Sequence, residues 1–301
     1  MSRPVLIAGC GYVGSALARR LVDAGGEVWG LRRSPAGLPQ GVRPVAADVE
    51  DPDLLREALA QAGLPAGLDG AVYAVSASER SDAGYRRAYV DGPANLLRVL
   101  EGLGVGVRRF LFVSSTAVYG AGSAKAGSGR REGAGWVDET TPEVPDDFRG
   151  ERLLEGERRC LAGSSSAASA VILRLAGIYG PGRTRLVDSV RRGEAKCTEG
   201  EPVWTNRIHR DDCAGAIAHL LALEHPEAVY IGVDDEPADR CEVLRWLAER
   251  LGAPEPEVVP ETELPRRRSG TKRCSNRRLG ESGYRMTYPS FREGYGEMLG
   301  G

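Results

Sequence analysis

Long apolar runs are missing from this chain of 301 residues. No stretch approaches the ~20 consecutive apolar residues that a membrane-spanning helix needs, so we expect no membrane partner. The early apolar run from Val5 to Ala8 is too short for the core of a signal peptide, and no cleavage site follows it. These absences predict a cytoplasmic protein.

Charge of one sign is not in excess either, because 40 Lys and Arg residues stand against 42 Asp and Glu residues, for a net charge of -2. A chain this balanced has no global positive field to hold nucleic-acid phosphates, so we expect no nucleic-acid partner. The six cysteines form no CxxC pair, and no cluster of residues has the spacing of metal ligands. The sequence therefore predicts free thiols and no metal.

What is present is an alternation of short apolar runs and amphipathic runs. The apolar runs that predict strands are 5–8, 27–31, 43–47, 70–76, 110–114, 170–175 and 228–233. The amphipathic runs that predict helices are 15–24, 54–62, 85–103, 149–161, 214–223 and 241–251. Strands buried on both faces and separated by helices predict an α/β fold with a doubly wound parallel sheet, the Rossmann architecture. Residues 121–135, rich in Ala, Gly and Ser, show no periodicity and predict a mobile loop.

A glycine motif follows the first predicted strand and opens the first predicted helix. It reads Gly9-Cys10-Gly11-Tyr12-Val13-Gly14, a GxGxxG. The first glycine permits a tight turn, the second lets the backbone approach a pyrophosphate, and the third lets the helix pack closely on the sheet. This context favours a dinucleotide site over an ordinary strand–helix turn, with Gly9, Gly11, Tyr12, Val13 and Gly14 as candidate cofactor-binding residues.

The end of the second strand predicts which dinucleotide binds. Sites that prefer NAD place an acid about 20 residues after the glycines, on the ribose 2′-OH, but this chain has Arg32, Arg33 and Ser34 there. Two guanidinium groups suit the 2′-phosphate of NADP, so we expect NADP, with NAD less favoured. Asp48 and Val49 either reach the adenine or begin a helix. The remaining candidates follow the fourth strand, where the backbone would pass the cofactor: Ala74, Val75 and Ser76.

Four further segments resemble the extended short-chain dehydrogenase/reductase family, the NAD(P)-dependent epimerases and dehydratases. These segments are Tyr89 to Leu97, Phe112 to Gly120 with its Ser-Ser-x-x-Val-Tyr-Gly run, Arg174 to Gly182 with its Tyr-Gly-Pro-Gly run, and Asn206 to Ala214. They occur in the family's order and cover most of the chain.

The resemblance implies a catalytic Ser, Tyr and Lys, of which this chain keeps one. The family's Ser corresponds to Ser115, whereas Phe148 stands at the Tyr position and Arg152 at the Lys position. Phenylalanine transfers no proton, and Lys to Arg is not a neutral change in a shaped site. Together with GxGxxG in place of the extended members' GxxGxxG, these departures imply that the chain resembles an atypical subgroup of the family that lacks the Tyr-x-x-x-Lys pair.

Three other residues are candidates for the missing acid or base. They are Tyr119, Tyr179 and His209, although each of them is equally well explained as a core or helix-capping residue. Acidic residues of the 149–161 helix, Glu151, Glu155 and Glu157, are best explained by a solvated helix face.

The sequence leaves two hypotheses for function. The first is an NADP-dependent oxidoreductase or epimerase/dehydratase-like enzyme acting on a small polar or nucleotide-linked substrate, with Ser115, Arg152 and Tyr119 as catalytic candidates. The second is a non-catalytic NADP(H)-binding sensor or scaffold. In both, residues 1–178 with 208–233 form the NAD(P)-binding domain, and residues 179–207 with 234–301 form a smaller substrate-side region. A monomer and a homodimer both stay open.

Overall fold

The structure of the protein is a computed structural model that describes residues 4–126, 135–163, 169–198, 200–260, 263 and 272–300. The chain divides into two compact units. The first contains Met1–Val118, Asp147–Arg174 and Cys213–Tyr230, and the second contains Tyr119–Asp146, Leu175–Asp212 and Ile231–Gly301. Residues 119–146 thus group with the second unit, whereas the sequence-based division placed them with the first.

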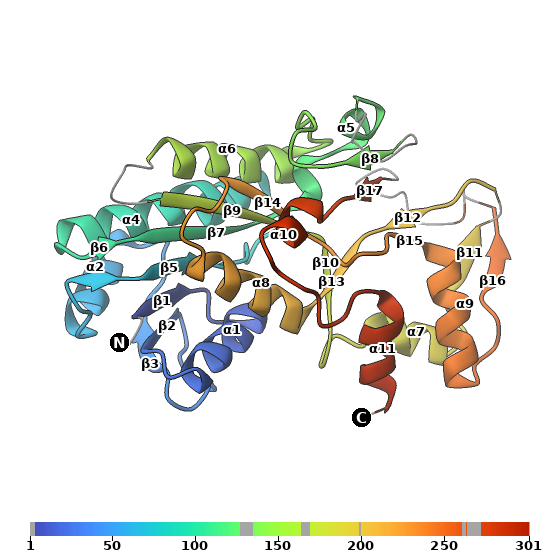
Figure 1. The fold of residues 1–301 in the computed structure, drawn as a ribbon, viewed down its shortest axis with the longest axis horizontal. Coiled ribbons are helices and arrows are strands. Elements are labelled where there is room, and N and C mark those ends of the chain that lie inside the picture. Colours follow the sequence, from blue (N-terminus) through green and yellow to red (C-terminus); the bar gives the residue numbers. More distant parts are fainter. Residues whose placement is uncertain are drawn as a thin grey trace. The chain divides into compact units, whose positions relative to one another are not determined.

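The first unit is built on a seven-stranded sheet in the order β14-β9-β7-β5-β1-β2-β3 (Figure 1). Its strands are β1 (Val5–Ala8), β2 (Val28–Arg32), β3 (Arg43–Ala46), β5 (Gly70–Tyr73), β7 (Arg109–Ser115), β9 (Ser169–Leu175) and β14 (Val229–Gly232). The strands run parallel, with β1 paired to β2 on one side and to β5 on the other. The chain reverses its direction of travel across the sheet between β1 and β5, which is the point where such folds bind ligands. The doubly wound prediction is confirmed.

Helices cover both faces of this sheet, as a doubly wound fold requires (Figure 1). One face carries α2 (Pro52–Gln61), α4 (Gly92–Gly102) and α6 (Phe148–Ala162), and the other carries α1 (Tyr12–Asp23) and α8 (Arg210–Ala222). Local signals set the start of α2, because the Asp51 carboxylate accepts the backbone N–H groups of Asp53 and Leu54, and Pro52 occupies the first helical position. Asp48 therefore does not begin this helix.

Two predicted segments differ from the structure. The helix expected over 85–103 begins earlier and is interrupted: α3 (Asp82–Arg86) leads into a π-helical turn (Arg87–Asp91) and then into α4. Residues Ala121–Ala126 form helix α5, so the predicted loop is wrong there, and 127–134 lie outside the described residues. Alanine's high helix propensity outweighs the glycine content of α5.

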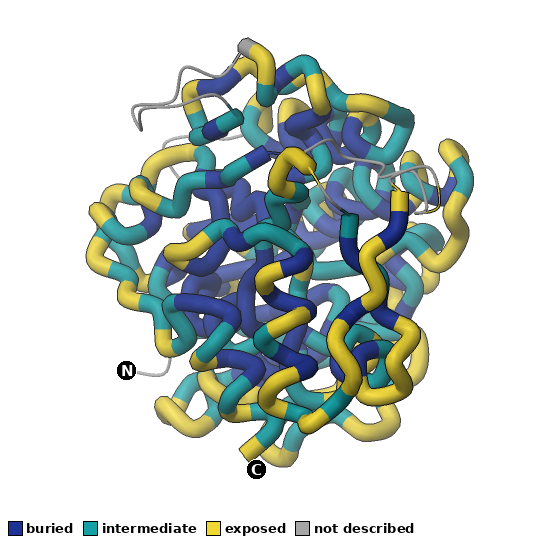
Figure 2. The backbone as a smooth tube through the Cα atoms, turned by 90° about the vertical axis from the view of Figure 1, so that its right-hand side faces the viewer, coloured by how far each residue is buried: buried dark blue, intermediate teal, exposed yellow. Residues whose placement is uncertain are grey.

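The core of the first unit lies between the sheet and its helices. Figure 2 shows the buried backbone in the interior and the exposed segments on loops and outer helix turns. Leu6 and Ala8 of β1 and Tyr73 and Phe112 of the neighbouring strands are fully buried, and the Tyr73 and Phe112 rings pack 5.8 Å apart. The short pair β4 (Gly67–Leu68) and β6 (Gly106–Val107) extends this unit.

The second unit, over its described residues, consists of short strand pairs and helices. The parallel pairs are β10 (Gly177–Tyr179) with β13 (Arg207–His209), β11 (Lys196–Thr198) with β16 (Glu257–Val259), and β17 (Arg273–Cys274) with β8 (Trp136–Val137). An antiparallel pair joins β12 (Trp204–Thr205) to β15 (Ala238–Asp239). Besides α5, the helices are α7 (Arg185–Arg191), α9 (Arg240–Leu251), α10 (Arg277–Glu281) and α11 (Phe291–Gly300).

A core of its own stabilises the second unit. It joins Leu244 and Leu247 of α9 to Phe291 and Tyr295 of α11, all of them buried. Helix α11 approaches Tyr179 so closely that a Cβ at Gly294 would lie 1.9 Å from the Tyr179 hydroxyl oxygen. A larger residue at this position would therefore force the buried Tyr179 ring to move.

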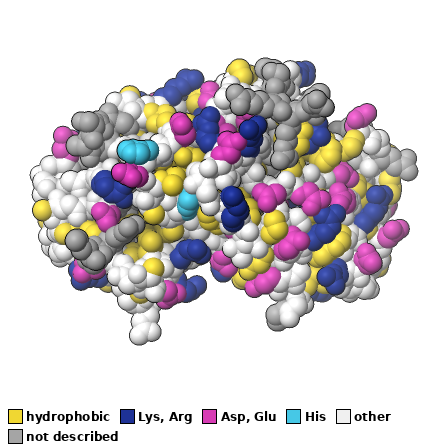
Figure 3. All heavy atoms as spheres, viewed as in Figure 1, with side chains coloured by type: hydrophobic (Ala, Val, Ile, Leu, Met, Phe, Trp, Pro, Cys, Tyr) yellow, Lys and Arg dark blue, Asp and Glu magenta, His cyan; other side chains and the backbone are white. Residues whose placement is uncertain are grey.

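Surface and composition agree with the sequence-based expectations about charge and thiols. Basic and acidic side chains are interspersed over the face drawn in Figure 3. All six cysteines are buried and free. Among the residues that the structure describes, no helix has both the length and the apolar character needed to cross a bilayer.

Candidate nucleotide and catalytic site

The glycine motif forms a turn between the end of β1 and the start of α1. Gly9 has φ +87°, a left-handed conformation that favours glycine. Its amide donates to the Leu31 carbonyl at the end of β2, and the Ala74 amide after β5 donates to the Ala8 carbonyl. These bonds hold the turn at the carboxyl edge of β1, between β2 and β5.

Close packing explains two of the three glycines, and the third leaves space. A Cβ at Gly9 would lie 2.4 Å from the carbonyl carbon of Ala74, and one at Gly14 would lie 2.4 Å from the Gly9 carbonyl oxygen. A Cβ at Gly11 would have only the Gly9 oxygen within 4 Å among the described residues, at 3.9 Å, so the backbone there has an open side. Gly11 is also the N-cap of α1, and it provides no side-chain cap. An open helix N-terminus of this kind suits a pyrophosphate, so the residues present fit a dinucleotide.

The two arginines after β2 have different surroundings. Arg32 is half-buried, and its Nη1 lies 3.5 Å from the Cys10 carbonyl oxygen in the glycine turn. Arg33 is exposed, and its Nη1 lies 3.9 Å from Asp48 Oδ2. Arg33 and Asp48 both line a hollow of about 420 Å³ whose other walls include Leu54 and Ala58. The hollow lies at the position where the motif predicts the adenosine end of a dinucleotide.

The other predicted cofactor residues surround the same edge of the sheet. Val49 is buried and its carbonyl accepts a hydrogen bond from Asn95 Nδ2 of α4 at 3.0 Å. Ala74 and Val75 follow β5 beside Gly9, and Ser34 and Ser76 are exposed. The fold thus gathers the ends of β1, β2, β3 and β5 at one edge.

Ser115 ends β7 and is half-buried, and its Oγ accepts the Ala117 amide at 3.2 Å. This leaves its hydroxyl proton for another partner. Its neighbour Ser114 faces the opposite way and donates from Oγ to Glu157 Oε1 at 2.5 Å. The alternation of a strand explains why adjacent serines have different partners.

Glu157 differs from the sequence-based interpretation of its helix as a solvated acidic face. Its side chain is 1% exposed and forms an ion pair of 2.6 Å with the buried Arg174. Glu155 lies two residues earlier, which is about 200° around a helix of 3.6 residues per turn, and it is on the outer side. The interpretation is therefore wrong for Glu157.

Phe148 begins α6 after the N-cap Asp147, whose side chain accepts the Arg149 amide. Its ring packs edge-on against Tyr85 of α3, with ring centroids 5.6 Å apart. Tyr85 in turn contacts Tyr89 at 5.2 Å. A tyrosine therefore lies directly against the phenylalanine that stands at the family's tyrosine position.

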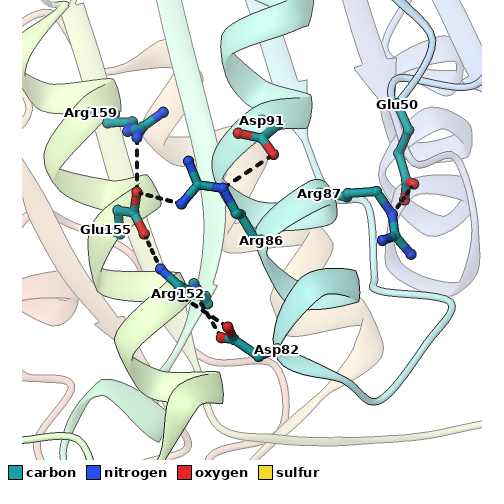
Figure 4. Close-up of polar contacts among 8 residues, drawn as sticks. All are labelled: Glu50, Asp82, Arg86, Arg87, Asp91, Arg152, Glu155 and Arg159. Atoms are coloured by element: carbon teal, nitrogen blue, oxygen red, sulfur yellow. Dashed lines mark hydrogen bonds and ion pairs between the residues drawn. The ribbon is translucent and has the colours of Figure 1, made fainter.

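Arg152 is held by two carboxylates (Figure 4). Its Nε and Nη2 donate to Asp82 of α3 at 2.7 and 2.9 Å, and its Nη1 donates to Glu155 at 2.7 Å. Its hydrogen bonds with these carboxylates, Asp82 first, raise its pKa. Glu155 also pairs with Arg86 of α3 and with Arg159 of α6. Arg152 would have to leave Asp82 before it could hold a ribose.

The remaining acid–base candidates of the sequence lie in the second unit. Tyr119 is fully buried, and its carbonyl accepts a hydrogen bond from the buried Lys272 ammonium. Tyr179 is buried, and burial raises its pKa. His209 is fully buried between the rings of Tyr179 and Tyr288, its Nδ1 accepts the Asp211 amide, and burial lowers its pKa. Such an imidazole is neutral and has its proton on Nε2.

Comparisons with known proteins agree with this geometry. The family model described as the NAD dependent epimerase/dehydratase family matches residues 5–232, more than half of the chain. The chain belongs to this family.

Relatives and solved structures extend over most of the chain. A 2-alkyl-3-oxoalkanoate reductase of Stenotrophomonas maltophilia (strain K279a) is 28% identical over 82% of this chain and 74% of its own length. Protein YeeZ of Escherichia coli (strain K12) is 27% identical over 95% of this chain and 97% of its own length. A solved structure from Methylobacillus flagellatus is 39% identical, covers 100% of this chain and 98% of its own, and has a TM-score of 0.77.

A UDP-glucose 4-epimerase of Thermus thermophilus, solved in complex with NAD, shares the fold. It has a TM-score of 0.77 at 24% identity over 99% of this chain and 98% of its own. Together with the family, these relatives support an NAD(P)-binding oxidoreductase or epimerase.

Sequence reasoning missed two features of these units. Tyr85 was seen only as part of a helix, because contact with Phe148 depends on how α3 packs on α6. Arg207 was seen only inside the Ile-His motif, although it is 7% exposed and carries a buried Nη1 without a hydrogen bond in the described part of the chain. No local sequence signal marks either of them.

Proposed function

We propose that the protein is an NADP-dependent oxidoreductase or epimerase/dehydratase-like enzyme with an altered proton relay, acting on a small polar or nucleotide-linked substrate. The observation that carries the proposal is the glycine turn, which has an open side at Gly11. A hollow at the ends of β2 and β3, lined by Arg33 and Asp48, supports it. The Stenotrophomonas relative, named as a reductase of 2-alkyl-3-oxoalkanoates, supports carbonyl chemistry.

In this proposal the first unit holds the cofactor, which supplies or accepts a hydride when it is bound. The amides at the start of α1 bind the pyrophosphate, together with the backbone of Ala74 and Val75. Arg33 and Ser34 bind the 2′-phosphate, and Arg32 secures the turn through the Cys10 carbonyl. Asp48 and Val49 contact the adenine. Arg33 carries the preference for NADP, since it is exposed and only loosely paired with Asp48.

Ser115 orients the substrate oxygen, and we assign the missing hydroxyl to Tyr85. The support for this role is the packing of the Tyr85 ring against Phe148, which stands at the family's tyrosine position. Arg152 and Tyr119 stay candidates of second rank, because one is held by Asp82 and the other is fully buried.

The first experiment is calorimetric titration with NADPH and NADH, followed by a turnover screen against aldehydes, ketones and nucleotide sugars. We expect NADPH to bind at least about tenfold more tightly than NADH, since a charge-assisted hydrogen bond to phosphate contributes about 1.5–3 kcal/mol. No heat with either dinucleotide, on folded protein, would contradict the whole proposal.

The second candidate is a non-catalytic NADP(H)-binding sensor or scaffold. Arg152 in ion pairs and a phenylalanine at the tyrosine position favour it. Phe148→Tyr separates the two candidates: turnover gained or raised in this variant supports an enzyme whose site is otherwise intact. NADPH binding without turnover in both forms supports the sensor.

Localisation, assembly state and partners are also proposals, and they follow from the sequence. We infer a cytoplasmic protein that acts as a monomer or homodimer and has no nucleic-acid or membrane partner. Light scattering after size exclusion distinguishes the two assembly states, and a mass of about twice the 32.2 kDa of the chain identifies the dimer.

A further inference from the structure

The π-helical turn that joins α3 to α4 (Arg87–Asp91) has a cause in the sequence. Pro93 lies at the start of α4. In a regular α-helix its ring would clash with the carbonyl group four residues earlier, and it has no N–H to donate. The chain forms a wider turn instead, in which the Gly92 amide donates to the Arg87 carbonyl, five residues back.

This wider turn leaves the Ala88 carbonyl without a donor from the helix. The oxygen would accept from Gly92 in an α-helix and from residue 93 in a π-helix. The Gly92 amide already donates to Arg87, and Pro93 has no amide hydrogen. The Tyr73 hydroxyl of β5 takes their place, because it donates to the Ala88 carbonyl at 2.5 Å.

Tyr73 is fitted closely to this contact. Its side chain is fully buried, and burial, the largest cause, raises the pKa of its hydroxyl well above the ordinary value. The hydroxyl therefore keeps its proton and stays a donor. Gly92 leaves room for it, since a Cβ there would lie 2.1 Å from the Tyr73 oxygen. A buried carbonyl that loses its donor is costly, so loss of this hydroxyl should loosen the turn.

Helix α6 packs directly against the same turn. A Cβ at Gly156 would lie 2.0 Å from the Tyr89 carbonyl oxygen, so the two backbones are in contact there. Phe148 begins the same helix and meets Tyr85 of α3, with ring centroids 5.6 Å apart. The shape of the turn therefore affects how α3 meets α6.

The rotation of α3 is sensitive to this turn. Because an α-helix has 3.6 residues per turn, a change of register by one residue would rotate α3 by about 100°. That rotation would carry the Tyr85 ring away from Phe148. A second contact between α3 and α6, the ion pair of Asp82 with Arg152 (Figure 4), is accessible to solvent, and such pairs contribute little. The buried Tyr73 bond is the better placed of the two to fix α3.

We propose that Tyr73 is a positioning residue for the proton transfer assigned to Tyr85. Its hydroxyl completes the π-helical turn, and the turn holds α3 in the rotation that brings Tyr85 against Phe148. Tyr73 is fully buried and acts only through the turn. This inference rests on the proposed function, because it concerns the same proton transfer.

The kinetic test measures Tyr73→Phe in NADPH turnover of the best substrate from the screen of aldehydes, ketones and nucleotide sugars. We expect kcat to fall about 10–100-fold, since a misplacement of about 1 Å costs up to about 10²-fold, while KM and NADPH affinity stay within about threefold. The pH–rate profile should keep the limb assigned to Tyr85, because that hydroxyl is still present. Tyr230→Phe is the matched control: Tyr230 is buried in the same unit, its hydroxyl accepts the Glu227 amide at 2.9 Å, and kcat should stay within about twofold.

A double variant shows whether Tyr73 acts through Tyr85. In the Tyr85→Phe background, Tyr73→Phe should lower kcat by no more than about twofold, because the group that it positions is already absent. A loss as large as in the wild-type background would overturn the proposal, since it would show a general structural effect. Wild-type kcat in Tyr73→Phe would also overturn it.

Backbone amide hydrogen exchange tests the turn without any turnover. We expect exchange over residues 82–91 to accelerate at least about tenfold in Tyr73→Phe but not in Tyr230→Phe. Unchanged exchange in Tyr73→Phe would show that the hydroxyl does not hold the turn. If Tyr73→Phe does not fold, Gly92→Ala replaces it in each measurement, because the new Cβ displaces the hydroxyl.

The two proposals fail in different ways. A large loss of kcat in Tyr85→Phe with none in Tyr73→Phe overturns the positioning role alone. Wild-type kcat in Tyr85→Phe, or no turnover of any substrate, overturns the proton transfer and the positioning role together. In that case, faster exchange in Tyr73→Phe would still show that Tyr73 holds the turn.

Discussion

Arg174 and Glu157 form an ion pair that is closed off from solvent, with Nη2 2.6 Å from Oε2 and side chains 2% and 1% exposed. Arg174 Nε adds two bonds of 3.1 Å to the same carboxylate, and Ser114 donates to it as well. The pair ties α6 to β9 and β7 directly behind the strand end that carries Ser115. Breaking such a pair leaves an uncompensated charge in the interior.

We expect Glu157→Ala to lower the free energy of unfolding by about 3–5 kcal/mol, measured by urea denaturation. Glu155→Ala is the matched control on the same helix, because the Glu155 side chain is 28% exposed and solvent-accessible ion pairs contribute about 0–1 kcal/mol each. Equal losses in the two variants would contradict the special role of the buried pair.

The sequence predicts the strands and the glycine turn around this ion pair, but it does not predict the pair itself. The strand runs and the glycine turn were predicted because burial on two faces and left-handed backbone have local signatures. Glu157 has no such signature: its partner lies 17 residues away on β9, and only the packing of α6 on the sheet brings them together. A helix this rich in charged residues therefore looked uniformly solvated.

The candidate site also contains residues that the sequence predicts and contacts that it does not predict. Gly9, Gly14 and Arg33 follow from motif spacing, because each is fixed by the chain next to it. The contact of Tyr85 with Phe148 and the position of Arg152 against Asp82 depend on how α3 meets α6, which includes an unpredicted π-helical turn after α3. A hollow in the second unit, lined in part by Arg207, likewise joins β10 and α7 to Tyr295, far along the chain on α11.

Gly9→Ala tests the turn. The new Cβ would lie 2.4 Å from Ala74 backbone in a left-handed conformation, so we expect NADPH binding to fall at least about tenfold and stability to fall by about 2 kcal/mol or more. Gly25→Ala is the control, because Gly25 has φ +80° and a Cβ there would meet no atom of the described residues within 4 Å, which isolates the cost of backbone strain at about 1–2 kcal/mol. Wild-type NADPH affinity in Gly9→Ala would refute the assignment of the turn.

Arg33→Glu tests the cofactor preference. A carboxylate at this position repels the 2′-phosphate and suits a ribose 2′-OH, so we expect NADPH affinity to fall about 10–100-fold while NADH affinity holds or rises. The measurement is calorimetric titration at constant salt. Arg43→Gln, at the start of β3 and paired with Glu27, should leave both affinities within twofold. A parallel loss of NADPH and NADH binding in Arg33→Glu would count against 2′-phosphate recognition.

The buried Asp234 makes the free energy of unfolding depend on pH, and the raised pKa of its carboxyl group sets the direction of that dependence. Because burial raises its folded pKa, the folded state binds more protons than the unfolded state above the unfolded pKa near 3.8. Stability therefore decreases as the pH rises from about 4 toward the folded pKa, by at most about 1.4 kcal/mol per pH unit for this group. Asp234→Asn removes the titration, so the variant should gain stability relative to wild type as the pH rises. A constant difference between pH 4 and pH 8, followed by urea denaturation, would show that Asp234 has an ordinary pKa.

The proton relay provides the sharpest test of the enzyme hypothesis, and it rests on the contact between Tyr85 and Phe148. If the Tyr85 hydroxyl transfers the proton, Tyr85→Phe should lower kcat about 10²–10⁴-fold and leave NADPH affinity unchanged, since a positioned acid or base contributes about that factor. The pH–rate profile should lose one limb.

In the double variant Tyr85→Phe with Phe148→Tyr, a hydroxyl returns at the family's own position, and part of the rate should return with it. Tyr89→Phe is the control, because Tyr89 lies in the π-helical turn after α3 and its ring also contacts Tyr85, and it should change kcat far less. An unchanged kcat in Tyr85→Phe would assign the proton transfer to another group, and unchanged rates in the double variant would show that the Phe148 position does not reach the reacting atoms.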